Sequence, residues 1–95
     1  MACYIIATIR VTDPEAYVEY TKASSVAAEK YGARFLVRGG HMETLEGSVD
    51  ATRVVVLEFD TREKAQAWWN SAEYEAAKAL RRRASTAEFI MVDGA

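Results

Sequence analysis

Apolar and polar side chains alternate along the first part of the chain. One set of alternate positions holds Ile5, Ala7, Ile9 and Val11. The positions between them hold Tyr4, Ile6, Thr8 and Arg10. Successive side chains of a β-strand point to opposite faces of the sheet, so this alternation indicates a strand. We predict that the strand runs from Cys3 to Val11.

The next segment changes to the three-and-four spacing of a helix. Its apolar stripe consists of Tyr17, Tyr20, Ser24, Ala27, Ala28 and Tyr31. Asp13 can accept a hydrogen bond from an unpaired amide of the first turn, and Pro14 suits the first helical position, where no donor is needed. Gly32 is expected to end the helix, because glycine adopts the left-handed conformation that other residues resist.

Two more strands are predicted in the middle of the chain. The first, Ala33–Arg38, alternates between one side with Phe35 and Val37 and another with Arg34, Leu36 and Arg38. The second, Arg53–Phe59, is almost continuously apolar, which is typical of a central strand covered on both faces. Between them we predict a Gly-rich loop, in which residues 42–47 have the pattern of a short extension.

The last third of the chain predicts a broken helix and a final strand. Asp60 and Thr61 are both suitable N-caps for the first part of this helix. Asn70-Ser71 interrupts it and caps the second part. The apolar stripe of the two parts consists of Ala65, Trp68, Trp69, Tyr74, Ala77 and Leu80. The strand within residues 85–94 has two sides, with Phe89 and Met91 opposite Glu88, Ile90 and Val92.

This order of elements is the βαββαβ pattern of a ferredoxin-like α+β sandwich. Residues 1–95 would form a single domain, whose four-stranded antiparallel sheet carries its helices on one face. The other face would hold Tyr4, Ile6, Thr8, Arg10, Leu36, Arg38, Val54, Val56, Glu58, Ile90 and Val92. A face this apolar usually marks an interaction site. We therefore predict a homodimer in which two copies pack sheet against sheet, as in a dimeric α/β barrel.

Composition narrows the classes of function. The chain has 95 residues and a formal net charge of −2, without the basic stripe that nucleic-acid binding requires. The one basic run, Arg81–Arg83, is expected to be a solvated helix end. One cysteine and one histidine cannot form a zinc cluster, and no cofactor is indicated. The N-terminal segment lacks the features of a signal peptide or a membrane span, which predicts a soluble, cytoplasmic protein without a membrane partner.

Several short motifs are shared with a known family. They are RGG at 38–40, LEG at 45–47, RVVVLEF at 53–59, WWNSAEY at 68–74, ALRRRA at 79–84 and MVDG at 91–94. In order and spacing the chain resembles the domain of unknown function 1330 family. That family resembles the dimeric α/β-barrel superfamily, which includes cofactor-free monooxygenases, lactone isomerases and haem-degrading enzymes. The chain departs from the family pattern at Ala72, where proline is common, and at Trp69, where tyrosine is common, which could reshape a pocket.

The loop after the second strand contains the candidate catalytic residues. His41 could act as a base near neutral pH, with Glu46 as a second group able to move a proton. Arg38 could hold a carboxylate or an enolate-like oxygen through paired hydrogen bonds. The alternatives stay open, because Gly39-Gly40 is also what a sharp turn needs, and Arg38 could simply pair with Glu58.

The candidate substrate-binding residues are Arg38, Arg10, Glu58, Trp69 and Tyr74. The two aromatic residues belong to a group of rings at helical spacing, for which core filling is the plain explanation. A ring-lined cleft between helices and sheet could also hold a small, flat or acidic molecule.

Two classes of function follow from the sequence. One is a dimer that binds a small organic molecule beside the uncovered sheet face and catalyses a cofactor-independent proton transfer or oxidation of an organic acid or aromatic. The other is a non-catalytic dimer that binds a ligand or is purely structural. Superfamily membership does not decide between them, because one fold supports many functions.

Overall fold

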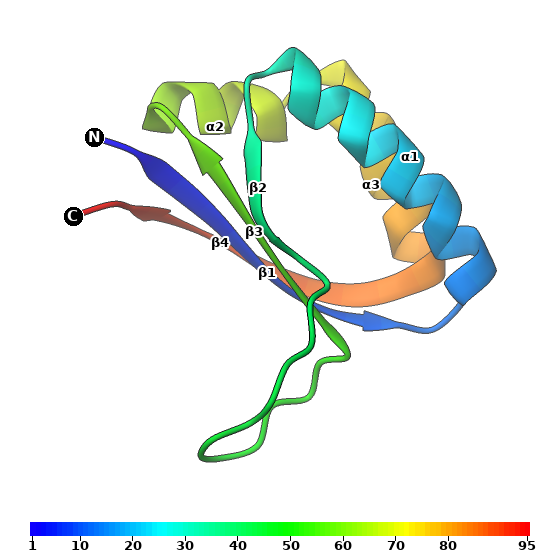
Figure 1. The fold of residues 1–95 in the computed structure, drawn as a ribbon. Helices are drawn as coiled ribbons and strands as arrows, with labels where there is room; N and C mark the ends of the chain where they lie inside the picture. Colours follow the sequence, from blue (N-terminus) through cyan, green and yellow to red (C-terminus); the bar gives the residue numbers. More distant parts are fainter.

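The computed structural model describes residues 1–95. Its elements are β1 (Cys3–Val11), α1 (Pro14–Lys30), β2 (Arg34–Arg38), β3 (Arg53–Phe59), α2 (Arg62–Trp69), α3 (Ala72–Ala84) and β4 (Ser85–Asp93). Figure 1 shows all three helices on one face of the sheet, with the other face uncovered. The predicted ferredoxin-like α+β fold is confirmed, including the break in the second helix. No helix combines the length and apolarity that crossing a bilayer would require.

Local capping explains where the helices begin. The Asp13 side chain accepts from the amide of Ala16, as predicted for α1. Of the two candidate caps of α2, Thr61 is the one used, because its hydroxyl accepts from the amide of Lys64. Ser71 caps α3 in the same way. Each cap satisfies an amide that the helix itself leaves unpaired.

The strands are ordered β2-β3-β1-β4, and every neighbouring pair is antiparallel. The continuously apolar strand β3 is therefore central, as predicted, and β2 and β4 form the edges. Across the uncovered face, Ile6 of β1 lies opposite Val56 on one side and Ile90 on the other. These side chains form an apolar surface, in which Ile90 is 55% exposed. Leu36 of the edge strand β2 is 53% exposed.

The core lies between the sheet and the helices. Its largest fully buried side chains are Trp68, Tyr74, Phe59, Ile9 and Cys3. The Trp68 ring lies 4.1 Å from the Tyr74 ring and 5.4 Å from the Phe59 ring, measured between centroids. The helical stripes read from the sequence thus meet the covered faces of β1 and β3, and the three largest fully buried side chains of this core are aromatic.

Strand β2 departs from the predicted alternation. Its register with β3 shifts between Phe35 and Val37, so Leu36 is an extra residue in a β-bulge. After the bulge, Val37 lies opposite Val56 on the uncovered face, and Arg38 lies opposite Val55 on the face that the helices cover. The predictions that Val37 shares a side with Phe35 and that Arg38 lies on the uncovered face are therefore wrong. One inserted residue exchanges the faces of all residues that follow it.

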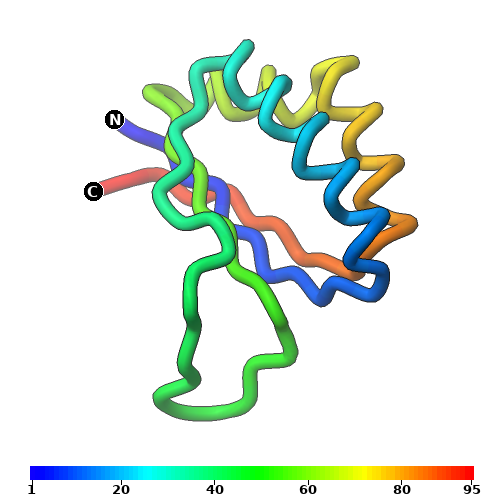
Figure 2. The backbone as a smooth tube through the Cα atoms, turned by 45° about the vertical axis from the view of Figure 1, so that its right-hand side comes forward, coloured from blue at the N-terminus to red at the C-terminus, as the bar shows by residue number.

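A long loop, residues 39–52, connects β2 to β3 without forming a helix or a strand. Figure 2 shows that this loop projects beyond the sheet, away from the helices. The short extension expected near residues 42–47 is not formed.

Candidate functional site

The predicted catalytic residues His41 and Glu46 lie in this projecting loop, and both are exposed. Neither lines either of the two pockets of the molecule. Within one copy of the chain, the structure therefore does not bring them together with the predicted substrate-binding residues.

Arg10 and Glu58 lie on the uncovered face, and each has a partner there. The Arg10 guanidinium donates to the Glu88 carboxylate with a distance of 2.9 Å between Nη2 and Oε2. Glu58 accepts from Arg34 Nε at 2.8 Å and from the Tyr4 hydroxyl at 3.1 Å. The hydrogen bond from Arg34, followed by that from Tyr4, lowers the pKa of Glu58. Glu58 is thus paired with Arg34 and Tyr4, and the pair with Arg38 that the sequence left open is not formed.

Arg38 reaches from β2 to helix α1 instead. Its Nη2 atom donates to the carbonyl oxygen of Thr21 at 3.2 Å and to the hydroxyl of Ser25. The guanidinium also lies over the ring of Phe35, with Cζ 4.1 Å from the ring centroid. Arg38 therefore connects the edge strand β2 to helix α1, across the space between the sheet and the helices.

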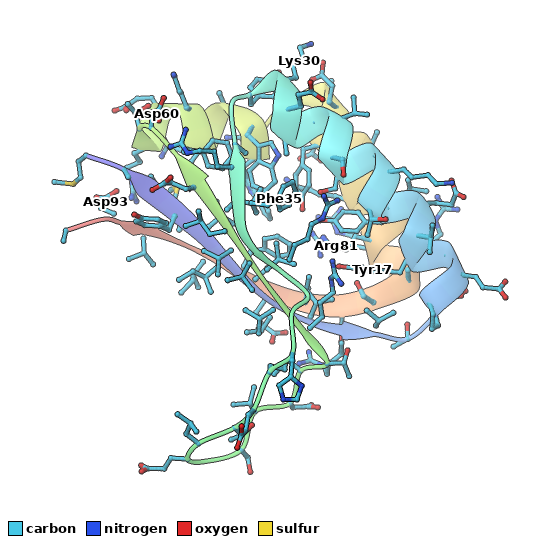
Figure 3. The ribbon with its side chains drawn as sticks, viewed as in Figure 1. Tyr17, Lys30, Phe35, Asp60, Arg81 and Asp93 are labelled. Atoms are coloured by element: carbon cyan, nitrogen blue, oxygen red, sulfur yellow. The ribbon has the colours of Figure 1, made fainter.

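A narrow chamber of about 10 Å³ lies in that space. The sheet contributes Ile9, Phe35, Arg38, Arg53, Val55, Leu57 and Phe89, and α1 contributes Tyr17, Tyr20, Thr21 and Ser24. Figure 3 shows Phe35, Tyr17 and Arg81 in the layer between the sheet and the helices. The volume is close to the minimum for one water molecule, so a ligand here requires lining side chains to move.

Two arginines in this layer have no carboxylate partner. Arg53 starts β3, and its Cζ lies 5.4 Å from the Tyr17 ring centroid. Arg81 lies in the last turn of α3, with Cζ 4.5 Å from the Phe89 ring centroid. The Nε atom of each is buried and has no hydrogen-bond partner. All ion pairs of the chain involve other cationic residues. Arg81 is buried and Arg53 is half-buried, and a guanidinium removed from water without a counter-charge is unfavourable.

Tyrosine hydroxyls accompany these arginines. The hydroxyl groups of Tyr20 and Tyr74 are hydrogen-bonded at 2.8 Å. Burial raises the pKa of Tyr17 and of Tyr74, although Arg53 opposes the shift at Tyr17 and Arg81 opposes it at Tyr74. Both phenols therefore stay neutral near pH ~7 and can donate a hydrogen bond.

A second, outer pocket of about 210 Å³ opens beside strand β4. Its lining consists of Ile5, Gln66, Trp69, Phe89, Ile90 and Met91. Trp69 thus lines a pocket, as the sequence suggested, whereas Tyr74 is fully buried in the core. Phe89 belongs to the linings of both the outer pocket and the inner chamber.

Arg53 and Arg81 are not among the site residues predicted from the sequence, although signals for both are present there. Arg53 is two positions before Val55, so alternation places it on the covered face of β3. Arg81 follows Ala77 by four positions, so helical spacing places it on the apolar stripe of α3. Arg81 is 6% exposed, so the prediction of a solvated arginine run is wrong for this residue and correct for Arg82 and Arg83.

Solved structures similar to this one share its fold. One is a protein of unknown function from Rhodopseudomonas palustris, with a TM-score of 0.79 and 18% identity over 99% of this chain and 82% of that one. Another is a dimeric ferredoxin-like protein of unknown function from Thermobifida fusca, with a TM-score of 0.69, 18% identity and coverage of 99% and 92%. A third is SnoaB, a cofactor-independent oxygenase from Streptomyces nogalater, with a TM-score of 0.63, 14% identity and coverage of 99% and 93%. At these identities the likeness concerns the fold alone.

Sequence comparison places the chain in a family. No curated protein sequence matches it. The model of the family described as "Domain of unknown function (DUF1330)" matches residues 2–95, nearly the whole chain. The motifs noted in the sequence pointed to the same family. The chain therefore belongs to the DUF1330 family.

Proposed function

We propose that the protein is a homodimer that binds a small organic anion between its helices and its sheet. The observation that carries this proposal is the buried, unpartnered Nε atom of both Arg53 and Arg81. A carboxylate or enolate oxygen would supply the missing counter-charge through charge-assisted hydrogen bonds. This site is the ring-lined cleft between helices and sheet, on the opposite face of the sheet from the surface that would dimerise.

Four polar side chains of the layer have a role in this proposal. Arg81 and Arg53 bind the anion, and the neutral hydroxyl of Tyr17 donates to it. Arg38 closes the chamber near α1, since it already bridges β2 and that helix through Thr21. Release of this bridge gives the ligand space that the closed chamber lacks.

The anion site is tested by replacing Arg81 with methionine, which keeps an unbranched apolar stem and removes the charge. Benzoate titrated into the unaltered protein in a calorimeter should bind, and Arg81→Met should weaken binding by about tenfold or more, since each hydrogen bond to a charged group contributes about 1.5–3 kcal/mol. Arg82→Met is the matched control, because Arg82 is exposed on the next position of the same helix. Equal weakening by both substitutions, or no binding at all, would contradict the proposal.

The dimer is supported by the apolar uncovered face and by the dimeric relative from Thermobifida fusca. Ile90→Lys places a charge at the middle of the face and should yield monomers in native mass spectrometry. Val26→Lys is the control, since Val26 is 66% exposed on helix α1, away from the sheet face. If the protein is a dimer both before and after Ile90→Lys, the interface lies elsewhere; a monomeric unaltered protein overturns this part of the proposal.

A cofactor-independent enzyme is the second candidate, favoured by the hydrogen-bonded hydroxyls of Tyr20 and Tyr74 beside Arg81. A guanidinium next to phenol donors could stabilise an enolate formed from a bound acid or aromatic. His41 and Glu46 stay predictions as proton-transfer groups in such a reaction. The mass of the ligand after long incubation separates the two candidates, because a non-catalytic protein returns the ligand unchanged.

A further inference from the structure

The inner chamber and the outer pocket have one wall in common, the side chain of Phe89. On the outer side, the Phe89 ring lies 5.3 Å from the Trp69 ring, measured between centroids. The Cζ atom of Arg81, which lines neither space, lies 4.5 Å from the centroid of the same ring. A single aromatic ring thus borders an apolar pocket and also contacts a buried cation.

The two compartments differ in chemistry. The outer pocket is lined by Ile5, Trp69, Phe89, Ile90 and Met91, with Gln66 as its one polar residue. The inner layer contains the guanidinium groups of Arg53 and Arg81, and the Nε atom of each has no hydrogen-bond partner. An apolar pocket gains affinity from hydrocarbon in proportion to the area that it removes from water. A guanidinium group gains affinity for a ligand from hydrogen bonds to carboxylate oxygens.

Within the sheet, Phe89 has few neighbours to hold its ring. Phe89 lies on β4, an edge strand that has only β1 as a neighbour, and its side chain is half-buried. Directly opposite on β1 is Ala7, whose side chain is a single methyl group. A larger residue at that position would fix the ring in place. Rotation of the ring about its first side-chain bond would open the outer pocket towards Arg81.

We infer that the ligand is an amphipathic carboxylic acid whose hydrocarbon body fills the outer pocket and whose carboxylate reaches Arg81 past the turned ring of Phe89. This inference rests on the proposed function and adds the class of ligand and its orientation. The outer pocket, at about 210 Å³, lies below the usual ~300–1,000 Å³ of ligand pockets, which selects a short alkyl chain or a single ring.

The test is a titration of the protein with acetate, butyrate and hexanoate, followed by NMR because the shorter acids bind weakly. Burial of a methylene group contributes about 0.8 kcal/mol, so affinity should rise about fourfold for each methylene added. Gln66→Trp fills the mouth of the outer pocket and should remove this dependence on chain length. Gln66→Ala is the matched control at the same exposed position of α2 and should preserve it.

The outcomes separate this inference from the proposed function. A chain-length dependence that Gln66→Trp removes and Gln66→Ala keeps supports the inference. Acids that bind through Arg81 with no chain-length dependence overturn the amphipathic ligand and leave the anion site standing. A dependence that survives Gln66→Trp places the hydrocarbon body elsewhere and also overturns the inference. If no acid binds, the proposed function and this inference fall together.

Discussion

Arg34 and Arg81 are the same kind of side chain in opposite surroundings. The Arg34 side chain is 49% exposed at the edge of the uncovered face, and it binds both Glu58 and Asp60 at 2.8 Å. Arg81 is 6% exposed and forms no ion pair. Water screens an exposed charge, whereas a buried charge needs a partner, so pairing matters more at Arg81. A chain selected for stability alone would place a carboxylate beside Arg81 before it placed two beside Arg34. For this reason we assign the inner arginines to a ligand.

The largest effect is expected at Gly39, which contacts the inner Arg53. Gly39 has a φ of +71°, and a Cβ atom there would lie 2.0 Å from Arg53 Nη1. Gly39→Ala should therefore lower the free energy of unfolding by about 2–3 kcal/mol, from left-handed strain of about 1–2 kcal/mol and displacement of Arg53. Urea unfolding measures this loss.

Gly47→Ala is the matched control for that experiment. Gly47 has a φ of +82°, and a Cβ atom there would meet nothing within 4 Å. The free energy of unfolding of Gly47→Ala should fall only by the contribution of left-handed strain, about 1–2 kcal/mol. Equal losses in the two variants would show that Gly39 does not hold the Arg53 side chain in its inner position.

Arg81→Met should raise the free energy of unfolding by about 1 kcal/mol, because it removes a buried, uncompensated charge and keeps most of the apolar stem. The outer counterpart is Arg10→Met, which breaks the ion pair with Glu88 and should leave stability unchanged or lower it. Thermal and urea unfolding of both variants measure the sign of each change. A clear loss of stability in Arg81→Met would mean that the inner arginine is satisfied within the chain, and the contrast with Arg34 would disappear.

The smallest effect concerns the paired charges of the uncovered face. Arg34, followed by Tyr4, holds the pKa of Glu58 below its ordinary value of 4.5. A carboxylate with a depressed pKa stabilises the folded state above its unfolded pKa, and this contribution is lost as the pH falls through the folded pKa. Glu58→Gln should therefore be less stable than the unaltered protein at pH ~7, with the difference shrinking towards pH ~3. A difference that stays constant on acidification would show that the pairing does not set the pKa.

The element order could be predicted because its signals are local. Asp13 with Pro14 and Ser71 after Asn70 each set a helix start through contacts within a few residues. The position of Arg38 could not be predicted, because the bulge at Leu36 exists only in the pairing of β2 with a strand far along the chain. Alternation places Arg53 on the covered face, but the sequence does not show whether a carboxylate lies near it there. The absence of such a carboxylate depends on which helix packs over the strand.

The bulge at Leu36 also bears on how the molecule could change over evolution. Loss of the bulge with every residue of β2 retained would restore strict alternation and exchange the faces of Val37 and Arg38. The helix-covered layer would lose a cation, and the surface proposed for dimerisation would gain one. Because β2 is an edge strand, such a change of register disturbs fewer neighbours than one in β1 or β3. A substitution that straightens β2 could thus alter the charge preference of the binding site and the self-association of the chain together, while the core of Trp68, Tyr74 and Phe59 stays unchanged.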